Sequence, residues 1–293
     1  MGSKSIKMTL KTLKDTLELI VFKHSIFALP FIFTAMFVAS KSLNGTAWFG
    51  SYLLIFGVLC AISARNFAMG VNRYHDAEID ALNPRTASRP SVDGRIGKSN
   101  MKIFIAINAL IFVLSSAFIN SLAFWLSSPF LLVLASYSYF KSFSALAHVI
   151  LGLCLGLSPI AGAVAVLAEI PLWSVLLCCG VVFWVAGFDV LYALQDMEFD
   201  KKMGLFSIPS RFGHDASMAA AALFHALAVL FWLFFAAEAG LGGFAYVGIL
   251  VCAFILYKEH LIVRKDFSKI DKAFFTLNGW VSVAFMVFVW MSL

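Results

Sequence analysis

Long apolar stretches, separated by short polar segments, run through almost the whole chain. A transmembrane helix needs about 20 mostly apolar residues, and by that measure the pattern predicts nine membrane-spanning helices. Their expected ranges are 20–40, 47–71, 102–121, 123–140, 146–168, 172–194, 217–237, 241–257 and 274–292. The pattern therefore predicts an all-α membrane protein in which residues 1–293 form a single integral-membrane domain.

The composition agrees with a membrane protein. The chain is 61% hydrophobic and 13% charged, whereas soluble globular proteins have about 45–50% apolar and about 25% charged residues. The first 20 residues form a basic, amphipathic lead-in. We interpret this segment as uncleaved, because its apolar part continues into a full span and no small-residue cleavage site follows.

The basic residues predict how the chain is oriented. With a cytoplasmic N-terminus, all of the 22 Lys and Arg residues except Lys41 and Arg65 fall on the cytoplasmic side, as the positive-inside rule requires. The polar segments 72–101, 195–215 and 258–273 then all face the cytoplasm, and the chain is expected in the cell inner membrane. The sequence contains no basic run interleaved with aromatic residues, so it does not indicate nucleic acid as a partner.

An acidic cluster follows the second predicted span. Asn72, Asp76 and Asp80 are spaced i, i+4, i+8, so a helix continuing out of the span places them along one stripe. Arg65 precedes Asn72 by two helical turns on nearly the same face. Because Arg65 lies inside a span, where a charge costs several kcal/mol and usually marks function, a merely solvated helix end does not explain this cluster.

A second acidic cluster follows the sixth predicted span. Asp189, Asp196 and Asp200 are spaced i, i+7, i+11, which predicts one helical face with Tyr192 close to it. Asp189 again lies inside a span. The two clusters are four spans apart, which predicts two four-helix halves, about 17–141 and 146–258, and a ninth helix at about 274–292. We expect a central cavity between the halves that opens to the cytoplasmic side.

These residue types indicate binding of Mg²⁺ and a diphosphate. Mg²⁺ takes oxygen ligands, commonly one or two carboxylates with water and phosphate oxygens, and arginine forks suit diphosphate oxygens. The expected metal ligands are Asn72, Asp76, Asp80, Asp196 and Asp200; the expected diphosphate-binding cations are Arg85, Lys141 and Lys201. Tyr137 and Lys141, four residues apart at a cytoplasmic helix end, fit interfacial anchors as well as they fit substrate-binding residues. The five cysteines lie in apolar spans without CxxC spacing, so we expect neither a disulfide nor a zinc site, and the six histidines are interpreted as structural.

Three motifs resemble those of the UbiA-type superfamily of intramembrane prenyltransferases. NRYHDAEID at 72–80 resembles its first Asp-rich motif, Asp189–Asp200 its second, and YSYFK at 137–141 its Tyr–Lys motif on the fourth helix. The runs KHSIFALPF at 23–31 and NPRT at 83–86 are similar to the branch that acts on 4-hydroxybenzoate. Part of that branch is associated with menaquinone made by the futalosine route. Arg73 stands where most members have Asp, which removes one carboxylate from the metal surroundings.

The resemblance implies Mg²⁺-dependent transfer of a polyprenyl group from its diphosphate to the ring of an aromatic acid in ubiquinone or menaquinone biosynthesis. Its implied catalytic residues are Asp76, Asp80, Asp189, Asp196 and Asp200; its implied substrate-binding residues are Arg65, Asn72, Arg85, Tyr137, Lys141, Tyr192 and Lys201. A 1,4-dihydroxynaphthoate acceptor is the alternative within the branch. Haem farnesyltransferases, chlorophyll synthases and archaeal ether-lipid synthases remain alternatives within the family. From another class, a membrane transporter is the rival reading, although the polar residues gather at one face instead of crossing the midplane.

Overall fold

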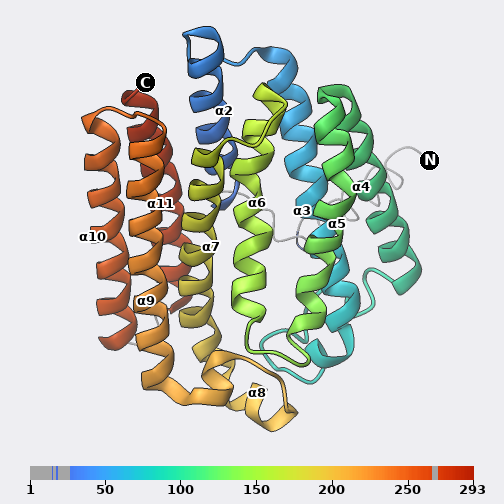
Figure 1. Cartoon of the computed structure of the whole chain (residues 1–293). Helices are drawn as coiled ribbons and strands as arrows, with labels where there is room; N and C mark the ends of the chain where they lie inside the picture. Colours follow the sequence, from blue (N-terminus) through green and yellow to red (C-terminus); the bar gives the residue numbers. More distant parts are fainter. Residues whose placement is uncertain (1–14, 16–17, 19–26, 266–269) are drawn as a thin grey trace, which may run out of the picture.

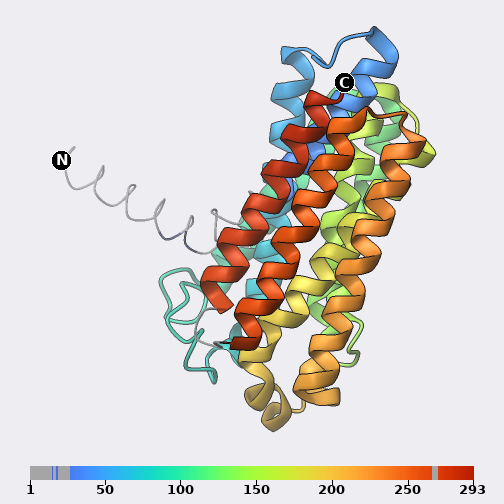
Figure 2. The ribbon, with the colours of Figure 1, turned by 90° about the vertical axis from the view of Figure 1, so that its left-hand side faces the viewer.

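The structure is a computed structural model that describes residues 15, 18, 27–265 and 270–293. Over these residues it is built of helices and contains no strand. In chain order, the helices are α2 (Leu29–Asn44), α3 (Ser51–Asp80), α4 (Lys98–Ile119), α5 (Ser121–Phe140), α6 (Ala147–Leu167), α7 (Leu172–Ala193), the 3₁₀ turn η2 (Leu194–Asp196), α8 (Met197–Met203), α9 (Ile208–Glu238), α10 (Gly243–Lys265) and α11 (Ile270–Met291). The long helices lie side by side, and the short α8 lies at one end of them (Figures 1 and 2).

The all-helical membrane fold is confirmed, and the number of spans is confirmed only in part. Seven helical stretches in the described ranges are long and apolar enough to cross a membrane, the last part of one being η2 and α8. The helix α2 has 16 residues, and the apolar stretch of α11, Phe275–Met291, is also shorter than a full span. Residues 20–26 of the first predicted span, His24 and most of the N-terminal lead-in lie outside the described residues. Nine spans therefore stays a prediction.

Two helices reach beyond the ranges that the apolar pattern predicts. The helix α3 runs past residue 71 to Asp80 and so carries the whole first cluster, as the spacing of that cluster predicts. The helix α9 spans Ile208–Glu238 but is kinked at Gly213, whose backbone (φ 78°, ψ −177°) is not helical. Its N-cap, Ser207, accepts a hydrogen bond from the Ser210 backbone and forms a capping box, and Pro209 lies in the first turn. The cap residues thus start a short helical segment, and the long apolar part of α9 follows the kink.

The prediction that Asp189, Asp196 and Asp200 lie on one continuous helical face is wrong. The helix α7 ends at Ala193, a 3₁₀ turn covers Leu194–Asp196, and α8 begins at Met197. At Asp196 the backbone (φ −97°, ψ 3°) departs from α-helical geometry. Because a 3₁₀ turn has three residues per turn instead of 3.6, the spacing that places Asp189, Asp196 and Asp200 on one stripe does not hold across it.

The helix α7 packs tightly on both of its sides, where glycines allow close approach. A Cβ added at Gly152 of α6 would lie 2.3 Å from the carbonyl oxygen of Val182 in α7. On the other side, a Cβ at Gly187 of α7 would lie 2.3 Å from the His225 ring of α9. Small residues at such contacts let helices approach within a membrane. The position of α7 is therefore set by backbone contact with α6 on one side and by contact of its backbone with the His225 ring on the other.

The largest buried cluster lies on one side of the molecule, among α2, α6, α7, α9, α10 and α11. Its centre is aromatic: Phe31, Trp184, Trp232 and Phe285 are each at most 1% exposed. By contrast, α5 buries only Ser127 and Ser138. The helices α3, α4 and α5 contact one another on the other side of the molecule, and α5 also packs against α6 (Figure 1). The space between this group and α6–α7 is where the cavity lies.

Candidate active site

A cavity of about 870 Å³ lies between α3, α5, α6 and α7, with the segment 81–97 at one end. Along α3 its lining changes from Gly57 and Ala61 to Asp76 and Asp80. Eleven of the predicted site residues line it: Arg65, Asn72, Asp76, Asp80, Arg85, Tyr137, Lys141, Asp189, Tyr192, Asp196 and Asp200. The cavity thus has a polar end, which holds both aspartate clusters, and an apolar part that continues between the helices.

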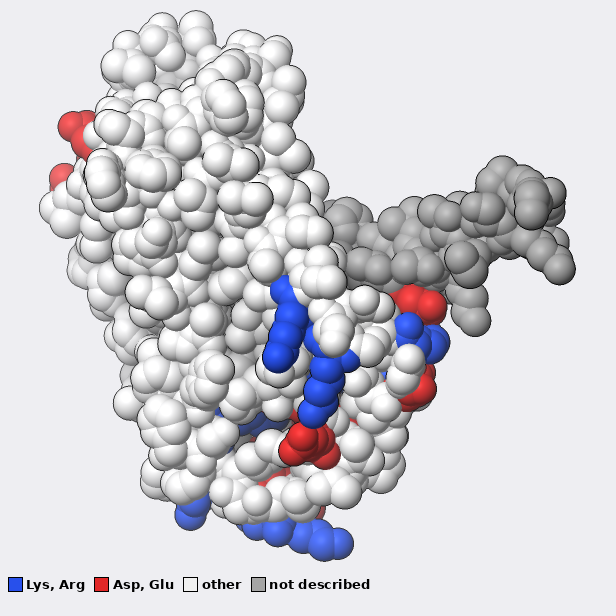
Figure 3. Space-filling view, turned by 90° about the vertical axis from the view of Figure 1, so that its right-hand side faces the viewer, with Lys and Arg blue, Asp and Glu red and all other residues white. Residues whose placement is uncertain are grey.

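The charged side chains gather near that polar end. On the face shown in Figure 3, Lys and Arg side chains and most of the Asp and Glu side chains lie toward the lower end of the helices. The surface above them is largely uncharged. The same end carries α8 and the segment 81–97 (Figures 1 and 2).

Lys201 is placed differently from the other predicted residues. It lies on α8, is exposed, and its Nζ is 3.2 Å from Glu198 Oε1. It lines a small surface pocket with Gly204, Leu205, Ser210 and Arg211 instead of the main cavity. An i, i+3 ion pair on a solvated helix accounts for its position.

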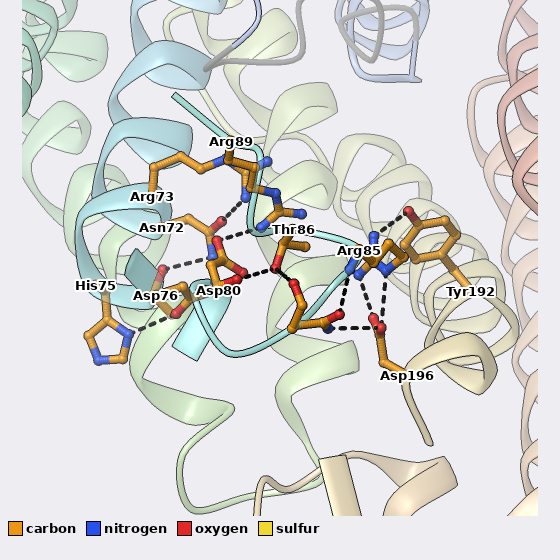
Figure 4. Close-up of polar contacts among 12 residues, drawn as sticks. Asn72, Arg73, His75, Asp76, Asp80, Arg85, Thr86, Arg89, Tyr192 and Asp196 are labelled. Carbon is orange, nitrogen blue, oxygen red and sulfur yellow. Dashed lines mark hydrogen bonds and ion pairs between the residues drawn. The ribbon is translucent and has the colours of Figure 1, made fainter. Parts of the chain in front are cut away.

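The first cluster is held by contacts within α3. Asn72 Nδ2 donates to Asp76 Oδ2 at 2.9 Å, and the His75 ring lies 2.9 Å from Asp76 Oδ1. Arg73 is buried, and its Nη1 donates to Asn72 Oδ1 at 3.1 Å. The arginine that departs from the family pattern therefore covers the amide oxygen of Asn72 (Figure 4).

The segment 81–97 joins the two clusters. Arg85 donates to both carboxylate oxygens of Asp196, through Nε at 3.0 Å and Nη2 at 2.5 Å, and to the Tyr192 hydroxyl at 3.2 Å. Asn83 Nδ2 donates to Asp196 as well, at 3.3 Å. Residues that follow α3 are thus bonded to residues in the last turn of α7 and just after it (Figure 4). The prediction that the two clusters meet across one cavity agrees with this geometry.

A second arginine of the segment binds the end of the first cluster. Arg89 Nη1 donates to Asp80 Oδ2 at 2.6 Å, and Thr86 Oγ1 donates to the Asp80 carbonyl at 2.9 Å. Arg89 lines the cavity but was not among the predicted substrate-binding residues. A loop contact nine residues apart follows no helical or strand period, so the sequence carries no periodic signal for it.

Asp200 and Asp189 are both connected to the start of α9. Asp200 is 2% exposed, and Ser207 Oγ donates to its Oδ2 at 3.0 Å. His148 Nδ1 lies 2.6 Å from Asp189 Oδ2, and His148 Nε2 accepts a hydrogen bond from the Ile208 backbone at 3.2 Å. Because Nε2 is an acceptor, Nδ1 carries the proton and the ring is neutral. His148 also lines the cavity, and the expectation that all histidines are merely structural does not account for this contact.

The oxygen atoms at the polar end fit a metal that arrives with a phosphate ligand. Among the described residues, no three His, Cys, Asp or Glu side chains converge on one point. The available donors are the amide and carboxylate oxygens of the two clusters, which are the atoms that Mg²⁺ selects. Since Mg²⁺ keeps several waters and commonly takes only one or two carboxylates beside substrate phosphates, a protein-only cage is not required.

Fold and site together define a helical membrane protein whose cavity suits an amphiphile with an anionic head and a long apolar tail. Residues 28–289 match the UbiA prenyltransferase family, and the chain belongs to this family. It is therefore a transferase, and the family resemblance seen in the motifs is confirmed.

Similar proteins extend over most of the chain. The 4-hydroxybenzoate octaprenyltransferase of Xanthomonas campestris pv. campestris (strain B100) is 30% identical over 76% of this chain and 74% of its own length. The enzyme of the same name from Francisella tularensis subsp. novicida (strain U112) is 25% identical over 87% of both chains. The apo structure of a UbiA homologue from Aeropyrum pernix K1 aligns with a TM-score of 0.81 and 30% identity, covering 91% of this chain and 96% of that one. A UbiA homologue from Archaeoglobus fulgidus, bound to GPP and Mg²⁺, shares the fold with a TM-score of 0.71 at 20% identity, covering 95% and 99%.

Proposed function

We propose that the protein transfers a polyprenyl group from polyprenyl diphosphate to the ring of an aromatic acid of the 4-hydroxybenzoate type, in quinone biosynthesis. The observation that carries this proposal is the single cavity that combines both aspartate clusters with a long apolar lining. The names of the Xanthomonas and Francisella relatives support the acceptor class. The GPP and Mg²⁺ bound to the Archaeoglobus homologue support the donor class and the metal.

The diphosphate is proposed to bind at the polar end. Mg²⁺, held by Asn72, Asp76, Asp80, Asp196 and Asp200, would neutralise the charge of the diphosphate and make it a better leaving group. Arg85 and Lys141 both line this end; we assign them to the departing anion, because cations placed where negative charge develops stabilise the transition state. Lys201 does not line the cavity, so we assign it only an indirect role in diphosphate binding, from the protein surface.

The apolar part of the cavity is proposed to hold the isoprenoid chain and to exclude water from the allylic cation. Arg65 lies in the wall of α3 and lines the cavity, and we assign it to the carboxylate of the aromatic acid. Tyr137 and Tyr192 also line the cavity and can face the cation with their rings, which attract positive charge.

The function is tested directly with the purified protein in detergent. With geranyl diphosphate and Mg²⁺ we expect prenylation of 4-hydroxybenzoate that EDTA abolishes. The product is identified by mass spectrometry. A parallel assay with 1,4-dihydroxy-naphthoate tests the alternative acceptor of the futalosine route. No product with either acceptor would end the aromatic-transferase proposal, and substrate-independent ion flux in liposomes would favour the transporter reading.

The arginine pairs predict how metal and diphosphate binding are coupled. Asp80 is bonded to Arg89 and Asp196 to Arg85, so these guanidinium groups compete with a metal cation for the carboxylates. Replacing Arg89 with Gln should therefore tighten binding of Mn²⁺ alone, by about threefold to tenfold for an interaction of about 1 kcal/mol. The same change should weaken binding of a prenyl diphosphate analogue. Electron paramagnetic resonance measures the first affinity and calorimetry the second.

Arg95→Gln is the matched control for this prediction. Arg95 belongs to the same segment but pairs with Asp15, Glu18 and Asp93, so its loss should leave Mn²⁺ affinity unchanged. Equal Mn²⁺ affinity in the wild type and in Arg89→Gln would contradict the view that Arg89 occupies a metal position.

We further propose the orientation that the basic residues predict, with the polar end of the cavity on the cytoplasmic side of the inner membrane. Aromatic acids and Mg²⁺ are water-soluble and would reach the site from there, while the lipid tail enters between helices. Cysteine labelling at exposed positions of the segment 81–97 in intact and opened cells tests this orientation.

A further inference from the structure

The contact between His148 and Asp189 is a polar contact in the cavity wall that has no role in the proposed function. His148 is 4% exposed and lies in the first turn of α6, and Asp189 lies near the end of α7. Their atoms Nδ1 and Oδ2 are 2.6 Å apart, and both residues line the cavity. A short, buried contact between two helices at the cavity wall fixes where the carboxylate group can lie.

The imidazole of His148 is itself held at both nitrogens. Nε2 accepts the backbone N–H of Ile208, the first residue of α9, at 3.2 Å. This N–H belongs to the first turn of a helix, where backbone donors have no partner within the helix. His148 therefore has one tautomer and one ring orientation, with Nδ1–H directed at Asp189. An oriented imidazole next to a carboxylate is the arrangement by which proteins align a reacting group.

Asp189 differs from Asp80 and Asp196 in its partner. Asp80 and Asp196 are each bonded to an arginine, which balances their charge. The neutral His148 ring donates to Asp189, so this contact orients the carboxylate without balancing its negative charge. Asp189 also lies seven residues before Asp196 along the chain, on α7, and so toward the apolar part of the cavity. This is the side on which an acceptor ring would meet the allylic cation.

We propose that His148 is a positioning residue that holds Asp189 as the proton acceptor for the aromatic ring; this inference rests on the proposed function. The C1–O bond of the prenyl diphosphate breaks, and its electron pair leaves with the diphosphate. The ring carbon beside the hydroxyl forms a bond to C1. The C–H bond at that carbon then breaks, its electrons restore the aromatic ring, and the proton moves to a carboxylate oxygen of Asp189 and later to water.

The test compares turnover with the kinetic isotope effect of ring-deuterated 4-hydroxybenzoate. A general base accelerates the reaction by about 10²–10⁴-fold. Asp189→Asn should therefore lose most of this acceleration, measured as turnover at saturating substrate. His148→Phe should lower turnover by about tenfold or more, with a smaller loss in His148→Gln, which keeps a hydrogen-bonding side chain. In all three variants the isotope effect on turnover should rise above the wild-type value, because loss of the ring proton becomes slower.

Two further measurements distinguish positioning from folding. Binding of geranyl thiolodiphosphate with Mg²⁺, measured by calorimetry, should stay near wild type in these variants. His260→Gln is the control, because His260 is bonded to His225 and not to the cavity carboxylates, and it should leave both turnover and isotope effect unchanged. Should His148→Phe fail to fold, His148→Gln and Asp189→Asn carry the same comparison.

The two proposals fail in different ways. If the wild-type protein prenylates neither aromatic acid, the proposed function is wrong. If the wild type is active but Asp189→Asn has normal turnover, or the variants lose turnover without any rise in the isotope effect, the function stands and the role of His148 and Asp189 is overturned.

Discussion

Replacing Asp196 with alanine is expected to lower prenyl transfer by at least about 10²–10³-fold while leaving the protein folded. Asp196 is where the two halves of the polar end meet, because it accepts hydrogen bonds from both Arg85 and Asn83. Its loss removes a proposed metal ligand and also releases the fork of Arg85 from its position. Asp76→Ala should have an effect of similar size, since Asp76 is the corresponding carboxylate of the first cluster.

This expectation is measured as turnover with geranyl diphosphate and 4-hydroxybenzoate, together with the melting temperature in detergent. Asp215→Ala is the matched control: Asp215 has a fully exposed side chain that contacts His214, and its loss should change neither quantity. Removal of a group that stabilises the transition state lowers turnover by about 10²-fold. If Asp196→Ala instead keeps turnover within about threefold of wild type, Asp196 does not belong to the proposed metal site.

Replacing Gly152 with alanine is expected to give the largest loss of stability among single substitutions in the helix contacts. The added Cβ would lie 2.3 Å from the Val182 carbonyl oxygen, and a backbone atom cannot move away as a side chain can. Overpacking of this kind costs about 1–3 kcal/mol or more. Because Gly152 lies one turn after His148 on α6, the same displacement should move His148 away from Asp189 and lower turnover.

The control is the same substitution at Gly57, also within a helix. A Cβ there would meet only the end of the Met36 side chain at 3.6 Å, an ordinary contact, so Gly57→Ala should keep or raise stability through its better helix propensity. Melting temperatures of the two variants in one detergent give the comparison. Equal melting temperatures would show that α6 and α7 can separate without cost.

Much of the fold and of the site could be predicted because helical periods are visible in a sequence. The spacing of Asn72, Asp76 and Asp80 predicted a helix that continues out of the span, and α3 does continue, as far as Asp80. The charges inside apolar stretches singled out Arg65 and Asp189, which both line the cavity. In each case the signal was local, either a repeat along one helix or a charge where burial is costly.

Other parts of the site depend on contacts between distant residues or within irregular segments. His148 meets Asp189 across 41 residues, and no spacing rule connects two residues on different helices. Arg89 reaches Asp80 through the loop that follows α3. The break after Ala193 contains neither Pro nor Gly, so the usual signals of a helix end were missing.

The glycine contacts around α7 also bear on how this enzyme can be redesigned. One wall of the cavity, α7, is in backbone contact with α6 on one side and packs its backbone against the His225 ring of α9 on the other, so a larger residue at these glycine contacts would disturb α6 or α9. The opposite wall is different, because α5 buries little and lines the cavity with Leu126, Phe130 and Leu134. Substitutions on α5 can therefore lengthen or shorten the space for an isoprenoid tail at little cost to the core, which makes this helix the place to alter the chain length of the donor.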